Sequence, residues 1–342
     1  MGNQCSTLHD RRSDVKVVYN NNELYLTVKA RHQPFISFQI VPLPYRPQKM
    51  SDVKGYQQEA AAYHLTEKEA HTFIENVLSM TDFSQNLLDD KLAFLDKLIY
   101  TMHQTIPFQS VYRCSIPSKD RHRPSFSLIK EHMFKKYGGT CKTIQTFFKC
   151  LLDALGYKTD FFPITVLGQE HVGIIVHDLA SQGSKHVVDV GCVYPTFTAI
   201  PLNFERNPKI YSVSFLKYKY VRRADGIVEW LHQSRSDEND WFRFAEMEVT
   251  NLVTVSYFFE TTERDFADPS NQFNSILRIS HYNGNCFFSV KDNIVKWSEE
   301  PQQKLLSKRV ETKEEIETML HEEFPQFPIE IIKQCVSNTL LT

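Results

Sequence analysis

The sequence predicts an α+β fold, because residues with helical spacing and residues with strand character occupy separate stretches of the chain. Residues 63–156 read as mainly helical, 157–270 as strands and turns, and 271–342 as a strand pair followed by helices. With 342 residues and 42% hydrophobic content, the chain is long enough to bury a large core. We therefore expect two or three packed subdomains: a helical part, a β part and a mixed C-terminal part.

Residues 1–62 form an extension before these three regions. Two strand-like segments, Val15–Tyr19 and Leu24–Lys29, flank three consecutive asparagines that favour a tight turn. A third segment, Phe35–Val41, leads into a proline-rich stretch. The pattern predicts a hairpin, whose strands either join the β part or stand apart.

The first residues match a lipidation pattern. Met1 to Ser6 fits M-G-x-x-x-[ST], in which Gly2 accepts a myristoyl chain after Met1 is removed. One such chain binds a membrane only marginally, and Cys5 is placed to supply a second anchor by palmitoylation. The segment lacks the apolar core of a signal peptide. We predict lipidation at Gly2 and Cys5 and attachment to the cytoplasmic face of a membrane; the alternative is a chance Met-Gly start.

The helical part begins with a capping box. Thr66 and Glu69 have the spacing in which each side chain satisfies the other's backbone N–H, which predicts a helix that runs to about Ser79. An apolar stripe predicts the next helix. Its members are Leu88, Leu92, Leu95, Ile99 and Met102.

Cys141 is the most informative residue of the chain. It ends the run Tyr137-Gly138-Gly139-Thr140-Cys141, where a loop leads into a helix that Gly156 closes. The unpaired N–H groups and the positive dipole end of a first helical turn favour a thiolate over a thiol. Cys141 is therefore a candidate nucleophile, although a cysteine taken alone is more often a packed structural residue.

A histidine and an acid follow on a predicted hairpin. Segments 171–176 and 186–190 read as strands joined by a polar turn. If the turn is centred near Ala180, paired residues have numbers that sum to 360, so His171 faces Asp189 with Cβ atoms roughly 4.5–5.5 Å apart. The acid would fix the imidazole tautomer, and the imidazole could deprotonate a nearby thiol. Cysteine, histidine and acid in this order predict a catalytic triad.

Several ordered blocks resemble the arylamine N-acetyltransferase family. His103–Val111 is similar to its IPFENL block, and Gly138–Cys141, with the Leu-Gly-Tyr that ends the following helix, resembles RGGxCxExN…LGF. Residues 171–176 resemble the family's histidine strand, and 187–191 resemble VDVGFG. A later match runs through 254–280, 292–293 and 311 onward, and it resembles the family's closing strands and last helix. The order of these blocks identifies the chain as similar to a distant member with an N-terminal extension.

The resemblance implies an arrangement of the fold. An N-terminal helical bundle would correspond to residues 63–156, a central β-barrel to 157–270 and a C-terminal α/β lid to 271–342. The resemblance also implies a cysteine-protease-like core, with the active site in the cleft between the first two parts.

The resemblance also implies a chemistry. Cys141, His171 and Asp189 would form the triad, and Phe108 lies where the family lines its acceptor pocket. The activity would be a ping-pong transfer of an acetyl or other acyl group from acyl-coenzyme A to an arylamine or arylhydrazine, as in xenobiotic metabolism. Acetyl-coenzyme A would be a co-substrate, and no cofactor would be tightly bound.

Three positions depart from the family pattern. Tyr137 stands where the family has an arginine, and Thr143 and Gln145 replace the residues that usually brace the loop of the nucleophile. Two alternatives therefore stay open. One is a lipid-anchored binding protein without catalytic activity. The other is a Cys–His–Asp thiol hydrolase, because the same triad also cleaves amides.

Composition excludes other classes. A net charge of −2 gives no reason to expect nucleic-acid binding. The 7 cysteines include no CxxC pair, and the 13 histidines show no metal-ligand spacing, so we expect neither a disulfide framework nor a metal site. We expect a reducing, cytoplasmic location.

Overall fold

The computed structural model divides the chain into two compact units, residues 1–53 and 54–342. In the first unit it describes the backbone of three strands. In the second it describes residues 54–194, 196–204, 209–234, 238–299 and 304–339.

The first unit holds an antiparallel three-stranded sheet of β1 (Val15–Asn20), β2 (Glu23–Val28) and β3 (Ile36–Ile40). Asn20 pairs with Glu23 across the turn between β1 and β2, so the hairpin expected from the sequence is present. Gly2 and Cys5 lie outside the described residues.

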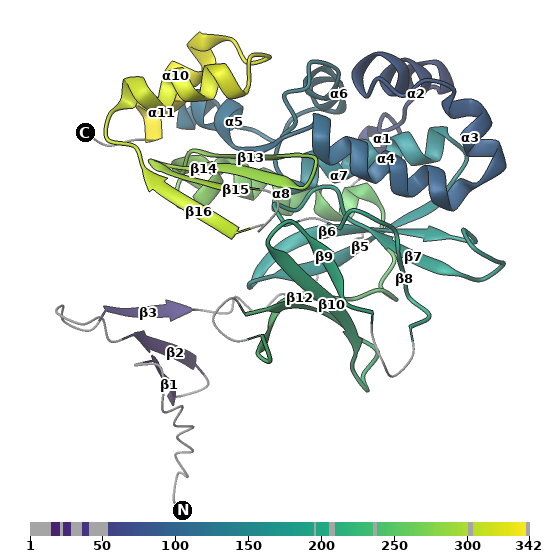
Figure 1. Ribbon diagram of the computed structural model, residues 1–342, viewed down its shortest axis with the longest axis horizontal. Helices are drawn as coiled ribbons and strands as arrows, with labels where there is room; N and C mark the ends of the chain where they lie inside the picture. The colour runs from purple at the N-terminus through teal and green to yellow at the C-terminus, as the bar shows by residue number, and fades with distance from the viewer. Residues whose placement is uncertain are drawn as a thin grey trace, which may run out of the picture. The chain divides into compact units, whose positions relative to one another are not determined.

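The second unit opens with helices (Figure 1). They are α1 (Lys54–Ala60), α2 (Glu67–Thr72) with a π-helical turn (Phe73–Val77), α3 (Phe83–Asp89), α4 (Lys91–Thr105), α5 (Val111–Ser115), α6 (Phe126–Phe134) and α7 (Cys141–Ala154). The Thr66–Glu69 capping box is confirmed, with Glu69 N donating to Thr66 Oγ1 at 3.2 Å. Within the described ranges, no helix is long and apolar enough to cross a membrane.

The predicted stripe on the second helix is wrong at its first position. Asp90 ends α3 and caps α4, because its carboxylate accepts from the backbone N–H groups of Leu92 and Ala93 at 3.0 and 2.9 Å. Leu88 therefore belongs to α3 and is 79% exposed. The later members on α4 are buried as expected: Leu95, Ile99 and Met102.

An eight-stranded sheet follows, in the order β8-β7-β6-β5-β12-β11-β10-β9 with antiparallel neighbours. Its strands are β5 (Lys158–Val166), β6 (Gln169–His177), β7 (Lys185–Val188), β8 (Ile200–Pro201), β9 (Tyr211–Val213), β10 (Leu216–Arg222), β11 (Val228–Gln233) and β12 (Trp241–Met247). The sheet curls, with β10 and β12 below β5 and β6 in Figure 1. In the described part of the chain its edges, β8 and β9, do not pair with each other, so the expected closed barrel is an open, curled sheet.

A five-stranded sheet completes the unit, in the order β16-β15-β14-β13-β4. Its strands are β4 (Phe108–Gln109), β13 (Arg278–Asn283), β14 (Cys286–Lys291), β15 (Ile294–Glu299) and β16 (Lys304–Arg309). Helices α8 (Phe259–Ala267), α9 (Gln272–Ser275), α10 (Lys313–Glu323) and α11 (Ile329–Thr339) flank these strands in the sequence. The predicted pair β13–β14 is present, whereas β15, β16 and the helix α8 were not foreseen.

The short strand β4 fixes the loop before Cys141. Gln109 N donates to Gly139 O at 2.8 Å, while β13 pairs with the other edge of β4. Gly138 has φ +68°, and a Cβ there would lie 2.0 Å from the Pro107 carbonyl oxygen. Only glycine fits this close approach. The helical part and the C-terminal sheet therefore meet beside the candidate nucleophile.

Candidate active site

Cys141 is the first residue of α7 and lines a cavity of about 300 Å³. Thr140 is the N-cap residue, but its side chain makes no capping hydrogen bond. Cys141 therefore lies at the positive end of the helix dipole, in a first turn that the Thr140 side chain does not cap.

His171 and Asp189 meet in the protein interior. His171 Nε2 lies 2.6 Å from Asp189 Oδ2, and the two side chains are 5% and 0% exposed. The second carboxylate oxygen of Asp189 accepts from Gly191 N at 2.9 Å. The acid is therefore held from both sides, and it orients the ring of His171.

The pairing that predicted this contact is wrong by two positions. Ile174 pairs with Val188 across β6 and β7, so paired numbers sum to 362 and not to 360, and Asp189 lies just beyond β7. The side chains still meet, because side-chain direction alternates with a period of two and a two-residue shift keeps the face. His171 and Asp189 are diagonal neighbours.

Electrostatics favours a charged imidazole. Burial opposes protonation of His171, but the charge and hydrogen bond of Asp189, together with a hydrogen bond to Cys141, raise the pKa of His171 to about 10. The structure thus brings the three predicted triad residues together. Their arrangement places the positively charged ring of His171 beside the sulfur of Cys141.

Gln145, read in the sequence only as a departure from the family, braces the site. Its fully buried amide donates to the carbonyl oxygens of Val172 and Val188 at 3.0 and 3.4 Å and accepts from Val190 N at 3.1 Å. One side chain of α7 thereby holds the backbone beside His171 and on both sides of Asp189. The sequence did contain a signal for this role of Gln145: it lies one helical turn after Cys141, on the same face of the helix.

A buried ion pair was missed altogether. Lys142, the residue after Cys141, lies 2.7 Å from a carboxylate oxygen of Glu170, the residue before His171, and 2.8 Å from one of Asp265. Burial alone would lower the pKa of Lys142, but the two carboxylates raise it. The charged side chain therefore ties α7 to β6 next to both catalytic candidates.

Tyr137 takes a packing role at the position of the family's arginine. Its ring stacks on Phe327 with centroids 4.9 Å apart and an interplanar angle of 18°, and the residue is 9% exposed. The loop before the nucleophile is therefore held by an aromatic contact to the segment between α10 and α11.

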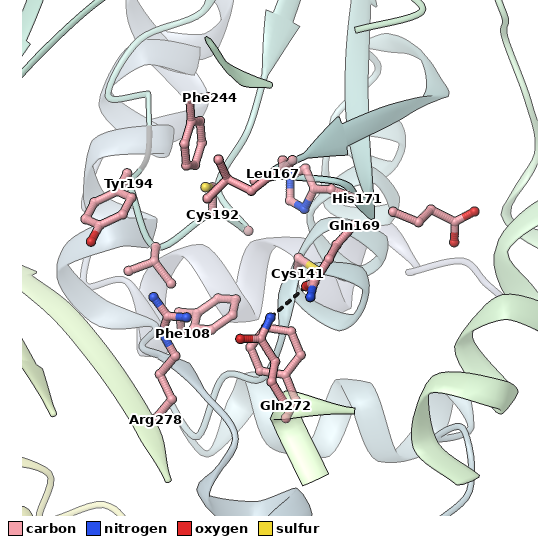
Figure 2. Close-up of a pocket in the computed structure, with 15 residues that line it drawn as sticks. Phe108, Cys141, Leu167, Gln169, His171, Cys192, Tyr194, Phe244, Gln272 and Arg278 are labelled. Atoms are coloured by element: carbon pink, nitrogen blue, oxygen red, sulfur yellow. Dashed lines mark hydrogen bonds between the residues drawn. The ribbon is translucent and has the colours of Figure 1, made fainter. Parts of the chain in front are cut away.

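The cavity beside Cys141 has a mainly apolar wall (Figure 2). Phe108, the predicted pocket residue, lies in this wall. Its ring packs edge to face on the ring of Phe273, with the ring centroids 5.7 Å apart. Cys192 also lines the cavity, and burial raises the pKa of its thiol. Gln272 donates to Gln169 at 2.6 Å, which links α9 to the β6 strand that carries His171. The cavity has room for a small molecule next to the sulfur.

Comparison with known proteins agrees with this geometry. A family model described as N-acetyltransferase matches residues 91–331, which is more than half of the chain. The chain therefore belongs to the arylamine N-acetyltransferase family, as the ordered sequence blocks predicted, and is an acyltransferase.

Solved structures share the fold at low sequence identity. The Mycobacterium marinum arylamine N-acetyltransferase in complex with CoA is 14% identical, with a TM-score of 0.64 over 79% of this chain and 99% of that one. The Salmonella typhimurium enzyme is 12% identical, with a TM-score of 0.64 over 80% and 99%. The Nocardia farcinica enzyme is 16% identical, with a TM-score of 0.64 over 80% and 96%. A search of curated protein sequences found no match to the chain.

Proposed function

We propose that the protein moves an acyl group from acyl-coenzyme A to the nitrogen of an arylamine or arylhydrazine through an acyl-cysteine on Cys141. The observation that carries this proposal is the contact of Cys141, His171 and Asp189 at the wall of an apolar cavity. The coenzyme bound to the Mycobacterium marinum relative supports acyl-coenzyme A as the donor.

In the first half of the reaction, Cys141 attacks the thioester carbonyl as a thiolate, next to the imidazolium of His171. A new carbon–sulfur bond forms, the bond to the coenzyme sulfur breaks, and the leaving thiolate takes the proton from the imidazolium. Asp189 stabilises the positive ring while it carries that proton.

In the second half, the amine nitrogen attacks the acyl-cysteine. His171 accepts the N–H proton as the amide bond forms, and Cys141 leaves as a thiolate. Phe108 and the apolar wall beside it would hold the aromatic ring of the acceptor. Acetyl is the donor group that the family implies, and the protein would act in the cytoplasm.

The finer organisation belongs to the same proposal. Residues 63–156 would act as the helical domain with the nucleophile, 157–270 as the β domain with His171 and Asp189, and 271–342 as a lid over a cysteine-protease-like core. The extension 1–62 would carry the lipid anchor at Gly2 and Cys5.

The decisive experiment is the intact mass of the purified full chain after incubation with acetyl-coenzyme A. We expect one added acetyl group that disappears when an arylamine is added. The adduct should be absent in Cys141→Ala and retained in Cys286→Ala, because Cys286 is a partly exposed thiol on β14 that does not line the cavity.

The alternatives give different results. Cleavage of peptide amides that needs Cys141 and no coenzyme A would identify a thiol hydrolase. If neither an acyl adduct nor hydrolysis occurs with any donor or peptide, the proposal fails, and the lipid-anchored binding protein takes its place.

A further inference from the structure

Arg278 places an unpaired positive charge in the wall of the cavity. The other charged groups of the described wall have partners: Glu170 pairs with Lys142, and His171 pairs with Asp189. The guanidinium of Arg278 has no hydrogen bond or ion pair to any residue that the structure describes, and its Nε is buried without a partner. Arg278 is half-buried, so its charge is only partly solvated and is available to an anion that enters the cavity.

The backbone of Arg278 is fixed relative to the nucleophile. Ser110 N donates to Arg278 O at 2.8 Å, and Arg278 N donates to Ser110 Oγ at 2.9 Å. The next residue of β13 pairs with Gln109, whose N–H donates to Gly139 O at 2.8 Å, two residues before Cys141. Arg278 therefore starts from a backbone position that is held against the loop of the nucleophile.

The side chain of Arg278 lines the same cavity as Cys141, next to Phe108. Its guanidinium carbon lies 6.0 Å from the centroid of the Phe108 ring. Figure 2 shows Phe108 between Arg278 and Cys141. The positive charge of Arg278 also counteracts the rise that burial imposes on the pKa of Cys192. The half-buried charge of Arg278 therefore acts on groups that line the cavity.

We propose that Arg278 binds a carboxylate of the substrate, carried either by the acyl group of the donor or by the aromatic amine. This inference rests on the proposed acyl transfer. A guanidinium binds a carboxylate through two parallel N–H···O bonds and remains charged in an apolar wall. Phe108 would hold the adjoining apolar part of the same substrate, so the pair selects molecules with a carboxylate next to an apolar segment.

The test uses matched pairs of substrates in the two half-reactions. The rate of acylation of Cys141 is measured by intact mass with malonyl-coenzyme A and with isovaleryl-coenzyme A. In the second donor an isopropyl group replaces the carboxylate. Deacylation of the acetyl-enzyme is timed with 4-aminobenzoate and with 4-aminobenzamide. The variants are Arg278→Gln, Arg278→Lys and the control Arg309→Gln, an exposed arginine on β16 of the same sheet.

The expected result is a rate preference for the carboxylated member of one pair. Arg278→Gln should reduce that preference by about tenfold to a hundredfold, the range for hydrogen bonds to charged groups. Arg278→Lys should keep part of it, and Arg309→Gln should keep all of it. The half-reaction in which the preference appears identifies whether the acyl group or the amine carries the carboxylate.

Two results would overturn the inference while leaving the proposed function intact. One is an unchanged preference in Arg278→Gln for both pairs. The other is an equal loss with every coenzyme A thioester, which would assign Arg278 to the phosphates of the coenzyme. If no donor acylates Cys141, the proposed function fails instead. The affinities of 4-aminobenzoate and 4-aminobenzamide for the wild type and Arg278→Gln, measured by calorimetry, then test the carboxylate site alone. Tighter binding of 4-aminobenzoate that is lost in Arg278→Gln supports the site, and equal binding of the two compounds to the wild type rejects it.

Discussion

Replacing Lys142 by methionine removes a buried charge between α7 and β6 and keeps a long apolar side chain. Lys142 is 8% exposed, whereas its partners Glu170 and Asp265 are 25% and 35% exposed. Breaking a fully buried ion pair costs about 3–5 kcal/mol, because a charge is left in the interior. Here the two carboxylates reach water, so we expect a smaller loss of about 2 kcal/mol in the free energy of unfolding.

The same substitution should also slow the reaction at Cys141. Lys142 follows Cys141 and Glu170 precedes His171, so their 2.7 Å contact sets the first turn of α7 against β6. A misplacement of about 1 Å in a catalytic pair costs about a hundredfold in rate. We therefore expect Lys142→Met to acylate Cys141 about tenfold to a hundredfold more slowly, while a loss of about 2 kcal/mol lowers the melting temperature by only about 4 °C.

The assay is the time course of acylation by intact mass, beside chemical unfolding of the same samples. Lys149→Met is the matched control. Lys149 lies on the same helix, and its Nζ is 2.7 Å from a carboxylate oxygen of Asp153. Neither residue lines the cavity. Lys149→Met should change neither quantity beyond about 0.5 kcal/mol. A Lys142→Met variant that is less stable yet acylates at the wild-type rate would refute the positioning role.

Three further predictions concern the imidazole, the glycine over the nucleophile and the N-terminus. The pKa of His171 is raised to about 10, so its pairing with Asp189 should stabilise the fold fully below about pH 6.5, its ordinary value, and progressively less up to pH 10. The stability difference between wild type and His171→Gln, from urea unfolding at several pH values, should therefore shrink as the pH rises; a constant difference contradicts it. Gly191→Ala should slow acylation at least tenfold, because a Cβ there would lie 2.8 Å from Cys141 O; a wild-type time course would disprove the close approach. Expression with an N-myristoyltransferase should add one myristoyl group to the mass of the wild-type chain and none to Gly2→Ala, and an unmodified wild-type mass rejects the anchor.

Local sequence signals were enough to find the catalytic candidates but not their exact pairing. Apolar residues at helical spacing, with glycines before and after them, located α7 and placed Cys141 at its start. The hairpin of His171 and Asp189 was found as well, yet its centre was misplaced. Asp178 adopts φ +57°, and its side chain accepts from Gly183 N at 2.7 Å, which closes the loop around a later centre. A non-glycine residue in the left-handed region is rarely foreseen from sequence.

Contacts between distant segments were beyond a single sequence. Strand β4 has only two residues, which is too short to show a periodic pattern in the sequence. Its partner β13 follows about half the chain length later. The same applies to Lys142, which joins Glu170 of β6 and Asp265 of α8. Charged residues normally predict solvent exposure, and only the folded arrangement shows that Lys142 is buried against two partly exposed carboxylates.

These non-local contacts also explain how the site keeps its geometry without the family's usual bracing residues. Tyr137 cannot form the ion pairs of an arginine, but its stacking on Phe327 holds the loop from the C-terminal side. Gln145 fixes the strands beside His171 and Asp189, and Lys142 holds α7 to β6 through a charge. Three different interactions thus act on the short segment around Cys141. Since buried polar groups are costly unless they are paired, the paired side chains of Gln145 and Lys142 favour a maintained site over a decayed one.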